Sequence, residues 1–465
     1  MSSTIPDANR KLSYDCLKCV IQKLEVNFRF QLVERLPKIS LAEKAVPLYI
    51  SQLSISEEGF QLNDTKYQFG VIRQAREGPN PEIIENDNRR GGSEIDIDRF
   101  GFEKYSRPEL TPGDILIQDV YPQKELDLDI VEARVLKSRD RLTVLGRHKM
   151  ELENSSEEDL ANIPMEKERD QLEKRNKTLS RDERLERINQ SIRCVKEELE
   201  REELHLQRYQ CKRDNLPSPF DMFIQLTKTS SDGTVYIERF NYDKTLMEAR
   251  KYLICKLLGN RPVVTQIKSL SFWSNLDEGL VIGLPEGIKL DVQEFGTSGN
   301  LSEVLKRVET IFEHPNRPFA CLESDDLRME DAQNPKVRNA EVLWLYDNYN
   351  DDFTALCCEL PNKKIVIDGC LAMQPRGYAM IVENLIDTKG TLGTYYEIRQ
   401  SREKKTIEAM SLIAKRFDNA VVGERLVTIP LPNQLQLDVS YAPFQFDSDT
   451  VLYTIKMEVV QSRNN

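Results

Sequence analysis

The sequence has few of the side chains, and none of the short motifs, from which most enzyme sites are built. It contains 3 histidines in 465 residues, and His148 and His205 fall in highly charged helical segments where we expect solvated side chains. Neither a Gly-x-Gly-x-x-Gly loop nor a Gly-x4-Gly-Lys-Ser/Thr loop is present to cradle a nucleotide. Gly-x-Ser-x-Gly and His-Glu-x-x-His are also absent. The sequence therefore predicts no catalytic residue, no cofactor and no enzyme.

A metal site is not predicted either. Cys16 and Cys19 form a Cys-x-x-Cys pair, but zinc needs two more ligands at compatible spacing and no second such pair follows. We expect both thiols to pack as small apolar groups within an amphipathic helix. The paired acids at 325–326 and 351–352 are typical of solvated turns.

Long apolar runs are missing from the chain. No stretch reaches the roughly 18 apolar residues of a membrane-spanning helix. The polar residues 1–11 lead into an amphipathic helix rather than the apolar core of a signal peptide. The 9 cysteines are scattered, which is typical of reduced thiols. We expect an intracellular protein, cytoplasmic or nuclear, that does not bind membranes.

Basic residues are outnumbered by acidic ones. The net charge is -12, and broad nucleic-acid binding requires a surface rich in Lys and Arg, so nucleic acid is not an expected partner. Charged residues reach 31% and hydrophobic residues only 39%. This composition predicts globular parts joined to a highly charged extension.

Residues 11–47 predict a helical head. Their apolar residues recur at the spacing of one helix face and then in steps of four: Leu17, Val20, Ile21, Leu24, Phe28, Leu32 and Leu36. Residues 48–119 predict a small β region, because apolar and polar residues alternate over 53–56 and 60–63 around a turn. The Gly- and Pro-containing stretch 78–92 predicts a mobile loop within it.

Residues 120–213 contain two heptad seams, one from Leu128 to Leu145 and one from Leu185 to Tyr209, surrounded by Glu, Lys and Arg. Two seams joined by a short linker favour an antiparallel, coiled-coil-like helical hairpin. Coiled-coil homodimerisation is the alternative.

From residue 217 to 465 the sequence predicts a β-hairpin followed by repeated strand–helix units. The hairpin turns at Ser231-Asp232-Gly233. Short apolar runs then recur roughly 22 to 32 residues apart, as in leucine-rich-repeat-like arrays; they centre on Ile267, Leu290, Phe319, Leu343, Val366, Tyr395 and Val427. Residues 435–439 and 451–460 predict a closing antiparallel pair. The fold class is thus α+β with several units, and the stacked units would leave an extended surface for a partner.

The head segment at residues 12–24 resembles a divergent F-box, the helical module that docks on the Skp-type adaptor of a cullin ubiquitin ligase. Ser13 stands where that family commonly has proline, and the family's later tryptophan is missing. The resemblance implies that the following residues would contact the adaptor: Leu12, Leu17, Val20, Ile21, Leu24, Leu32 and Leu36.

Nearly the full chain resembles a family expanded in nematodes, whose members are called F-box C proteins or are described only as a domain of unknown function. Besides the order of segments, residues 223–227, 284–288 and 298–302 carry this resemblance. It implies a substrate receptor of a ubiquitin ligase, with the head on the adaptor and the array on a target. The alternative is a scaffold or interaction protein that does not bind the adaptor.

Overall fold

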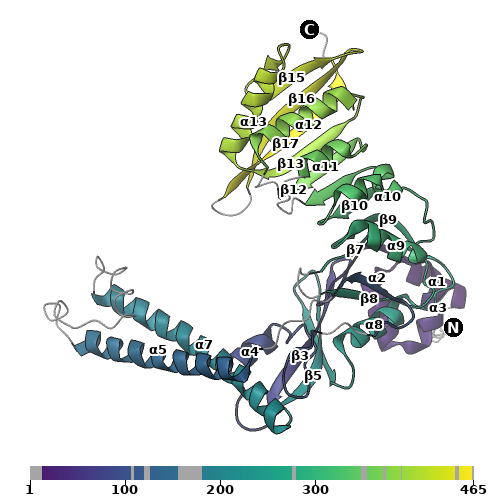
Figure 1. Ribbon diagram of the computed structural model, residues 1–465. Helices are drawn as coiled ribbons and strands as arrows, with labels where there is room; N and C mark the ends of the chain where they lie inside the picture. The colour runs from purple at the N-terminus through teal and green to yellow at the C-terminus, as the bar shows by residue number, and fades with distance from the viewer. Residues whose placement is uncertain are drawn as a thin grey trace, which may run out of the picture.

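The computed structural model describes residues 13–105, 109–119, 126–154, 181–274, 279–346, 353–369, 373–388, 390–445 and 450–462. One 15-stranded mixed sheet runs through the molecule, and helices lie along it (Figure 1). The coarse prediction of a mixed α and β protein is therefore confirmed. No helix within these ranges combines the length and the apolar character needed to cross a membrane.

The middle of the sheet is parallel, and its strands follow the order of the chain. Each strand of this parallel set pairs with the next member of the set. The first pair joins strands far apart along the chain, and β8 (Leu280–Gly283) lies between β7 and β9 in sequence but pairs elsewhere. The strands are β1 (Tyr49–Ile55), β7 (Thr265–Phe272), β9 (Leu290–Thr297), β10 (Cys321–Ser324), β11 (Leu343–Tyr346), β12 (Lys364–Asp368) and β13 (Tyr395–Ser401). Helices α9 (Leu301–Val308), α10 (Pro335–Asn339), α11 (Phe353–Glu359) and α12 (Pro375–Thr388) connect successive strands.

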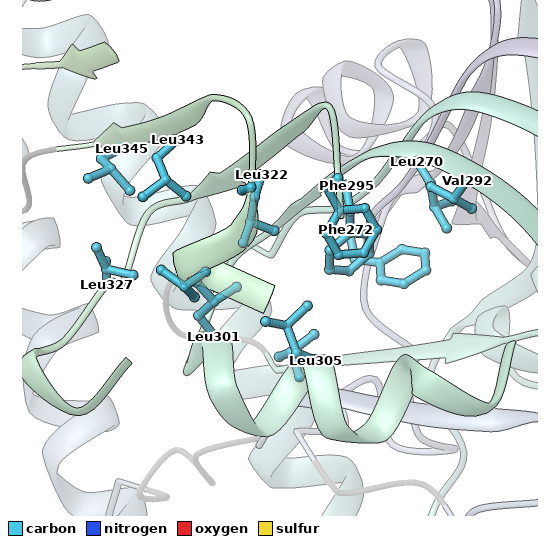
Figure 2. Packing of buried hydrophobic residues seen from close by; sticks show 14 of the residues in the cluster. Leu270, Phe272, Val292, Phe295, Leu301, Leu305, Leu322, Leu327, Leu343 and Leu345 are labelled. Atoms are coloured by element: carbon cyan, nitrogen blue, oxygen red, sulfur yellow. The ribbon is translucent and has the colours of Figure 1, made fainter. Parts of the chain in front are cut away.

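Apolar side chains form a ladder on the helix-facing side of this parallel sheet. Leu270, Phe295, Leu322 and Leu343 occupy one row across four neighbouring strands, and each is at most 1% exposed. Figure 2 shows them beside Leu301 of α9 and other apolar side chains. A single strand–helix unit could not bury this row, so neighbouring units complete one another's core.

The sheet ends in antiparallel strands. β17 (Val451–Gln461) pairs with β13 and with β16 (Leu435–Gln445), so the predicted pairing of these two terminal segments is confirmed. The run at Val427 was predicted to begin another unit of the array, and this is wrong. It forms β15 (Leu426–Leu431), which pairs antiparallel with β16 and with the short β14 (Val421–Val422). Helix α13 (Glu403–Arg416) precedes these strands.

The β region at 48–119 continues the same sheet. Beyond β1 lie β2 (Gly59–Leu62), β3 (Thr65–Ala75), β5 (Phe220–Thr229) and the edge strand β6 (Val235–Asn241). A separate pair forms from β4 (Asp114–Gln118) and β8 (Leu280–Gly283), next to α8 (Leu246–Leu258).

The prediction of a mobile loop at 78–92 is wrong, because this stretch contains helix α4 (Glu82–Arg89). There the side chain of Asn88 bonds to both the N–H and the C=O of Arg73 and fixes α4 on β3.

Helices α5 (Leu128–Asn154) and α7 (Arg181–Asp214) project from the sheet as an antiparallel pair (Figure 1). The Tyr209 hydroxyl near the end of α7 accepts from the N–H of Leu126, just before α5. At the other end, Arg181 donates to the C=O of Leu152. Ion pairs such as Arg139–Glu203 flank the buried seam. His148 is only 7% exposed, so the prediction of a solvated histidine was wrong there.

Candidate functional site

The head consists of α1 (Tyr14–Lys23), α2 (Val26–Arg35), a short 3-10 turn at Pro37–Ile39 and α3 (Ser40–Lys44). The Ser13 hydroxyl caps α1 by accepting from the N–H of Cys16, at 3.3 Å. The Glu25 carboxylate caps α2 by accepting from the N–H of Phe28, at 3.1 Å. Each cap satisfies an otherwise free N–H group in a first helical turn, so the chain breaks between the two helices at a defined position.

Two of the predicted adaptor contacts form the interior of the head. Ile21 is 1% exposed and packs with Ala42 and Val46, and Leu17 lies partly buried against them. Leu24 and Leu32 are half-buried. The predicted contact residues therefore do not share one accessible face.

The remaining predicted contacts are exposed. Val20 and Leu36 are 49% and 53% exposed. Other large apolar side chains of the head are exposed with them, namely Tyr14, Phe28 and Leu41. Leu12 lies outside the described residues. The head thus exposes several large apolar side chains, which makes it a candidate docking site.

The predicted burial of Cys16 and Cys19 is wrong, because both are exposed. Leu17 and Ile21 occupy the inward side of α1. Cys16 lies one position before Leu17, and Cys19 lies two positions after it. Because each residue turns a helix by about 100°, both thiols lie away from the side that Leu17 and Ile21 occupy.

A buried charge network joins the head to the sheet. Glu43 of α3 lies between two arginines: its Oε1 is 2.8 Å from Nη2 of Arg29, and its Oε2 is 2.8 Å from Nη2 of Arg261. These side chains are 2 to 4% exposed. Burial lowers the pKa of Arg29, and the nearby Glu43 carboxylate opposes that shift. The network thereby joins α2 and α3 to Arg261, which lies in the segment that follows α8.

Neutral hydrogen bonds reinforce this position. The Asn27 amide donates to the C=O of Leu62 at 3.0 Å and accepts from the Tyr67 hydroxyl at 3.0 Å. Burial raises the pKa of Tyr67, so this hydroxyl remains a donor. Val26 and Phe30 of α2 belong to the same apolar core as the strands. The head is therefore rigidly mounted on the sheet.

A cavity of about 550 Å³ lies between α4 and strands β3, β5 and β6. Its polar lining includes Asn88, Arg89, Gln225 and Arg239. Glu85, the one carboxylate of the described lining, accepts from the Asn80 amide. This lining offers hydrogen bonds and positive charge, but it holds no pairing of a nucleophile with a base.

Metal-ligating side chains do not gather in the part of the chain that the structure describes: no group of three His, Cys, Asp or Glu there could hold an ion. The ring of His205 instead contacts Phe102 and Tyr209, and burial together with nearby Arg208 lowers its pKa.

Sequence reasoning missed the network of Arg29, Glu43 and Arg261. No signal in the sequence marks these residues, because charged residues in a helix normally face water and the partners are distant along the chain. Periodicity found the apolar residues of the head but did not separate the inward from the outward ones.

Residues 245–402 match the model of a family described as a domain of unknown function (DUF3557). The match covers roughly a third of the chain, from the start of α8 to just beyond β13. It includes the parallel strands from β7 onward but not the head, α5, α7 or the antiparallel end. No curated protein matches the sequence.

Proposed function

We propose that this chain is a non-enzymatic protein-interaction protein whose head docks on a Skp-type adaptor of a cullin ubiquitin ligase and whose array holds a target. The observation that carries the proposal is the exposed apolar surface of a head that is itself tied down by Glu43. A rigid mount transmits the position of a bound partner to the array.

In this proposal the parallel strands and their helices act as a leucine-rich-repeat-like array. Support comes from the shared apolar row and from the order of the parallel strands, which follows the chain. The α5–α7 pair would serve as a charged, coiled-coil-like spacer. Such a receptor would work inside the cell, leave the transfer chemistry to its partner complex, and need no cofactor.

The alternative is a scaffold that does not bind the adaptor. Two observations favour the scaffold. Leu17 and Ile21 pack in the head's own interior, and the matched family model does not reach the head.

A pull-down with the purified adaptor separates the two functions. The variant should change only exposed residues, Val20→Asp together with Leu36→Asp, because Leu17 and Ile21 support the fold. Gln22→Asp is the matched control, because it changes an exposed residue of α1, the helix that contains Val20. The receptor predicts adaptor capture by wild type and by the control but not by the double variant. No capture by wild type would favour the scaffold.

A further inference from the structure

The parallel strands have a second face, opposite the helices, which we call the open face. Side chains alternate along a strand, so the strands that bury Leu322 and Leu343 turn Glu323 and Trp344 to this side. The open face is partly exposed and carries many acidic and aromatic side chains: Trp273, Glu294, Glu323, Asp325, Trp344, Tyr346, Asp368, Tyr395 and Glu397. Three lysines lie on the same side: Lys268 pairs with Glu294, and Lys364 and Lys456 are in register with Tyr395 and Glu397.

The open face already binds one guanidinium group of its own chain. The Arg399 guanidinium lies over the Trp344 ring, 4.5 Å from its centroid. Its Nε is 2.7 Å from Oε1 of Glu397, and its Nη1 is 3.9 Å from Oδ2 of Asp368. An aromatic ring and two carboxylates thus hold an arginine here, by cation–π attraction and ion pairing.

A similar set of groups lies beside it on the open face. The rings of Trp273, after β7, and Tyr346, on β11, meet edge to face with centroids 6.0 Å apart. The Tyr346 hydroxyl donates to Oε1 of Glu323 at 2.6 Å. Gly296 leaves room for the Glu323 carboxylate, because a Cβ at Gly296 would lie only 3.0 Å from Oε2 of Glu323.

This second set lacks the arginine. Across the described ranges, Glu323 and Asp325 make no ion pair, and Oδ1 of Asp325 is buried without a hydrogen-bond partner. Burial and the neighbouring Asp326 raise the pKa of Asp325 to about 6. Burial also raises the pKa of Glu323, and Glu294 and Asp368 add to the shift. A bound cation would offset this repulsion between carboxylates.

We propose that Trp273, Tyr346, Glu323 and Asp325 bind an arginine side chain of a protein that lies along the open face. This inference rests on the proposed function, because it names the chemistry of the target that the array would hold. The chain's net charge of -12 favours a basic partner as well.

Arginine fits these groups better than other cations do. Its planar guanidinium can stack on an aromatic ring while it donates to carboxylates at its edge, as Arg399 does. A lysine ammonium can do only part of this.

Tryptophan fluorescence gives a direct test, because both tryptophans of the chain, Trp273 and Trp344, lie on the open face. The full chain is titrated with a short, blocked Gly/Ser peptide that carries arginine. The matched peptide carries citrulline, which has the same shape without the charge. We expect a saturable signal with arginine, which persists in Trp344→Phe because Trp273 still reports it. The citrulline peptide should bind at least about tenfold more weakly.

The variants Glu323→Gln and Asp325→Asn keep the side-chain shape and both tryptophans. Each should weaken arginine binding about tenfold, whereas the control Glu238→Gln, an exposed acid on β6, should leave it unchanged. Circular dichroism checks that each variant folds. Equal binding of the citrulline peptide, or no saturable signal up to millimolar arginine peptide, would overturn the proposal. Adaptor capture by the head does not involve Glu323 or Asp325. Loss of arginine binding and loss of adaptor capture can therefore be told apart.

Discussion

Glu43 and Arg261 are separated by 218 positions in the sequence, yet Oε2 of Glu43 lies 2.8 Å from Nη2 of Arg261 and both side chains are at most 4% exposed. The same carboxylate also pairs with Arg29. One acidic side chain therefore bridges two buried guanidinium groups where the head meets the sheet. Removing one partner of a buried ion pair costs far more than the pair itself contributes, because a charge is left buried without compensation.

The first prediction is that Glu43→Gln destabilises the protein by about 3 to 5 kcal/mol. The measurement is the free energy of unfolding in urea, followed by circular dichroism. Glu34→Gln is the control, since Glu34 pairs with Lys256 at 3.9 Å while both side chains are 49% exposed; its effect should stay below about 1 kcal/mol. Equal effects of the two substitutions would show that the buried network does not anchor the head.

The second prediction concerns the apolar row that crosses the parallel strands. Leu322 is 0% exposed, so Leu322→Ala should cost about 2 to 5 kcal/mol by leaving a cavity between two units. Leu392, which is 55% exposed, supplies the control: Leu392→Ala should change the free energy of unfolding by about 0.5 kcal/mol or less. A small loss for Leu322→Ala would mean that adjacent units do not share one core.

The sequence was most informative where packing is local. The recurring apolar runs led to the right positions for most parallel strands, because each strand pairs with a near neighbour along the chain. The pairing of β1 with β7 was not predicted. Its partners, such as Leu53 and Leu270, are separated by α5, α7 and the β5–β6 hairpin, and no local pattern specifies a contact over that distance.

The candidate sites were harder to predict than the strands. Leu17 and Val20 have the same periodic pattern, and only the structure shows that Leu17 faces the head's interior while Val20 faces out. On the open face, Trp273 directly follows β7 and Tyr346 lies on β11, and β9 and β10 separate these two strands in the sheet. Their contact depends on strand order and register, which alternation along a single strand does not reveal.

The third prediction concerns the α5–α7 pair. Val195 is 1% exposed within the seam, whereas the adjacent Cys194 is exposed. Val195→Asp places an uncompensated charge in the seam and should destabilise the pair by about 2 kcal/mol or more. Hydrogen exchange should then accelerate in both helices while β11 and β12 keep their protection. Cys194→Ser should leave exchange unchanged. Loss of protection in β11 as well would indicate that the two helices fold as one unit with the array.

The last prediction is a pH dependence that Asp325 imposes on stability. Burial, with Asp326 and Glu323 nearby, raises its pKa in the folded protein to about 6, from an ordinary value of 3.8, although the backbone N–H of Gly299 opposes the shift. The folded state therefore binds this proton more tightly than the unfolded state does. The resulting stabilisation is fully present below the unfolded pKa and is lost as the pH rises through the folded pKa.

Asp325→Asn removes this titration while preserving shape. The variant should be more stable than wild type at pH 7, where wild type buries a carboxylate without an ion pair, and the advantage should shrink as the pH falls from about 6 to about 4. Urea unfolding of both proteins across this range measures the difference. Asp326→Asn is a useful comparison, because it removes one neighbour that raises the pKa of Asp325 and also the ion pair with Arg328 at 2.6 Å. Asp325 still titrates in this variant, so its stability should keep a pH dependence that Asp325→Asn lacks. A constant difference between wild type and Asp325→Asn at every pH would mean that Asp325 is not the group that titrates.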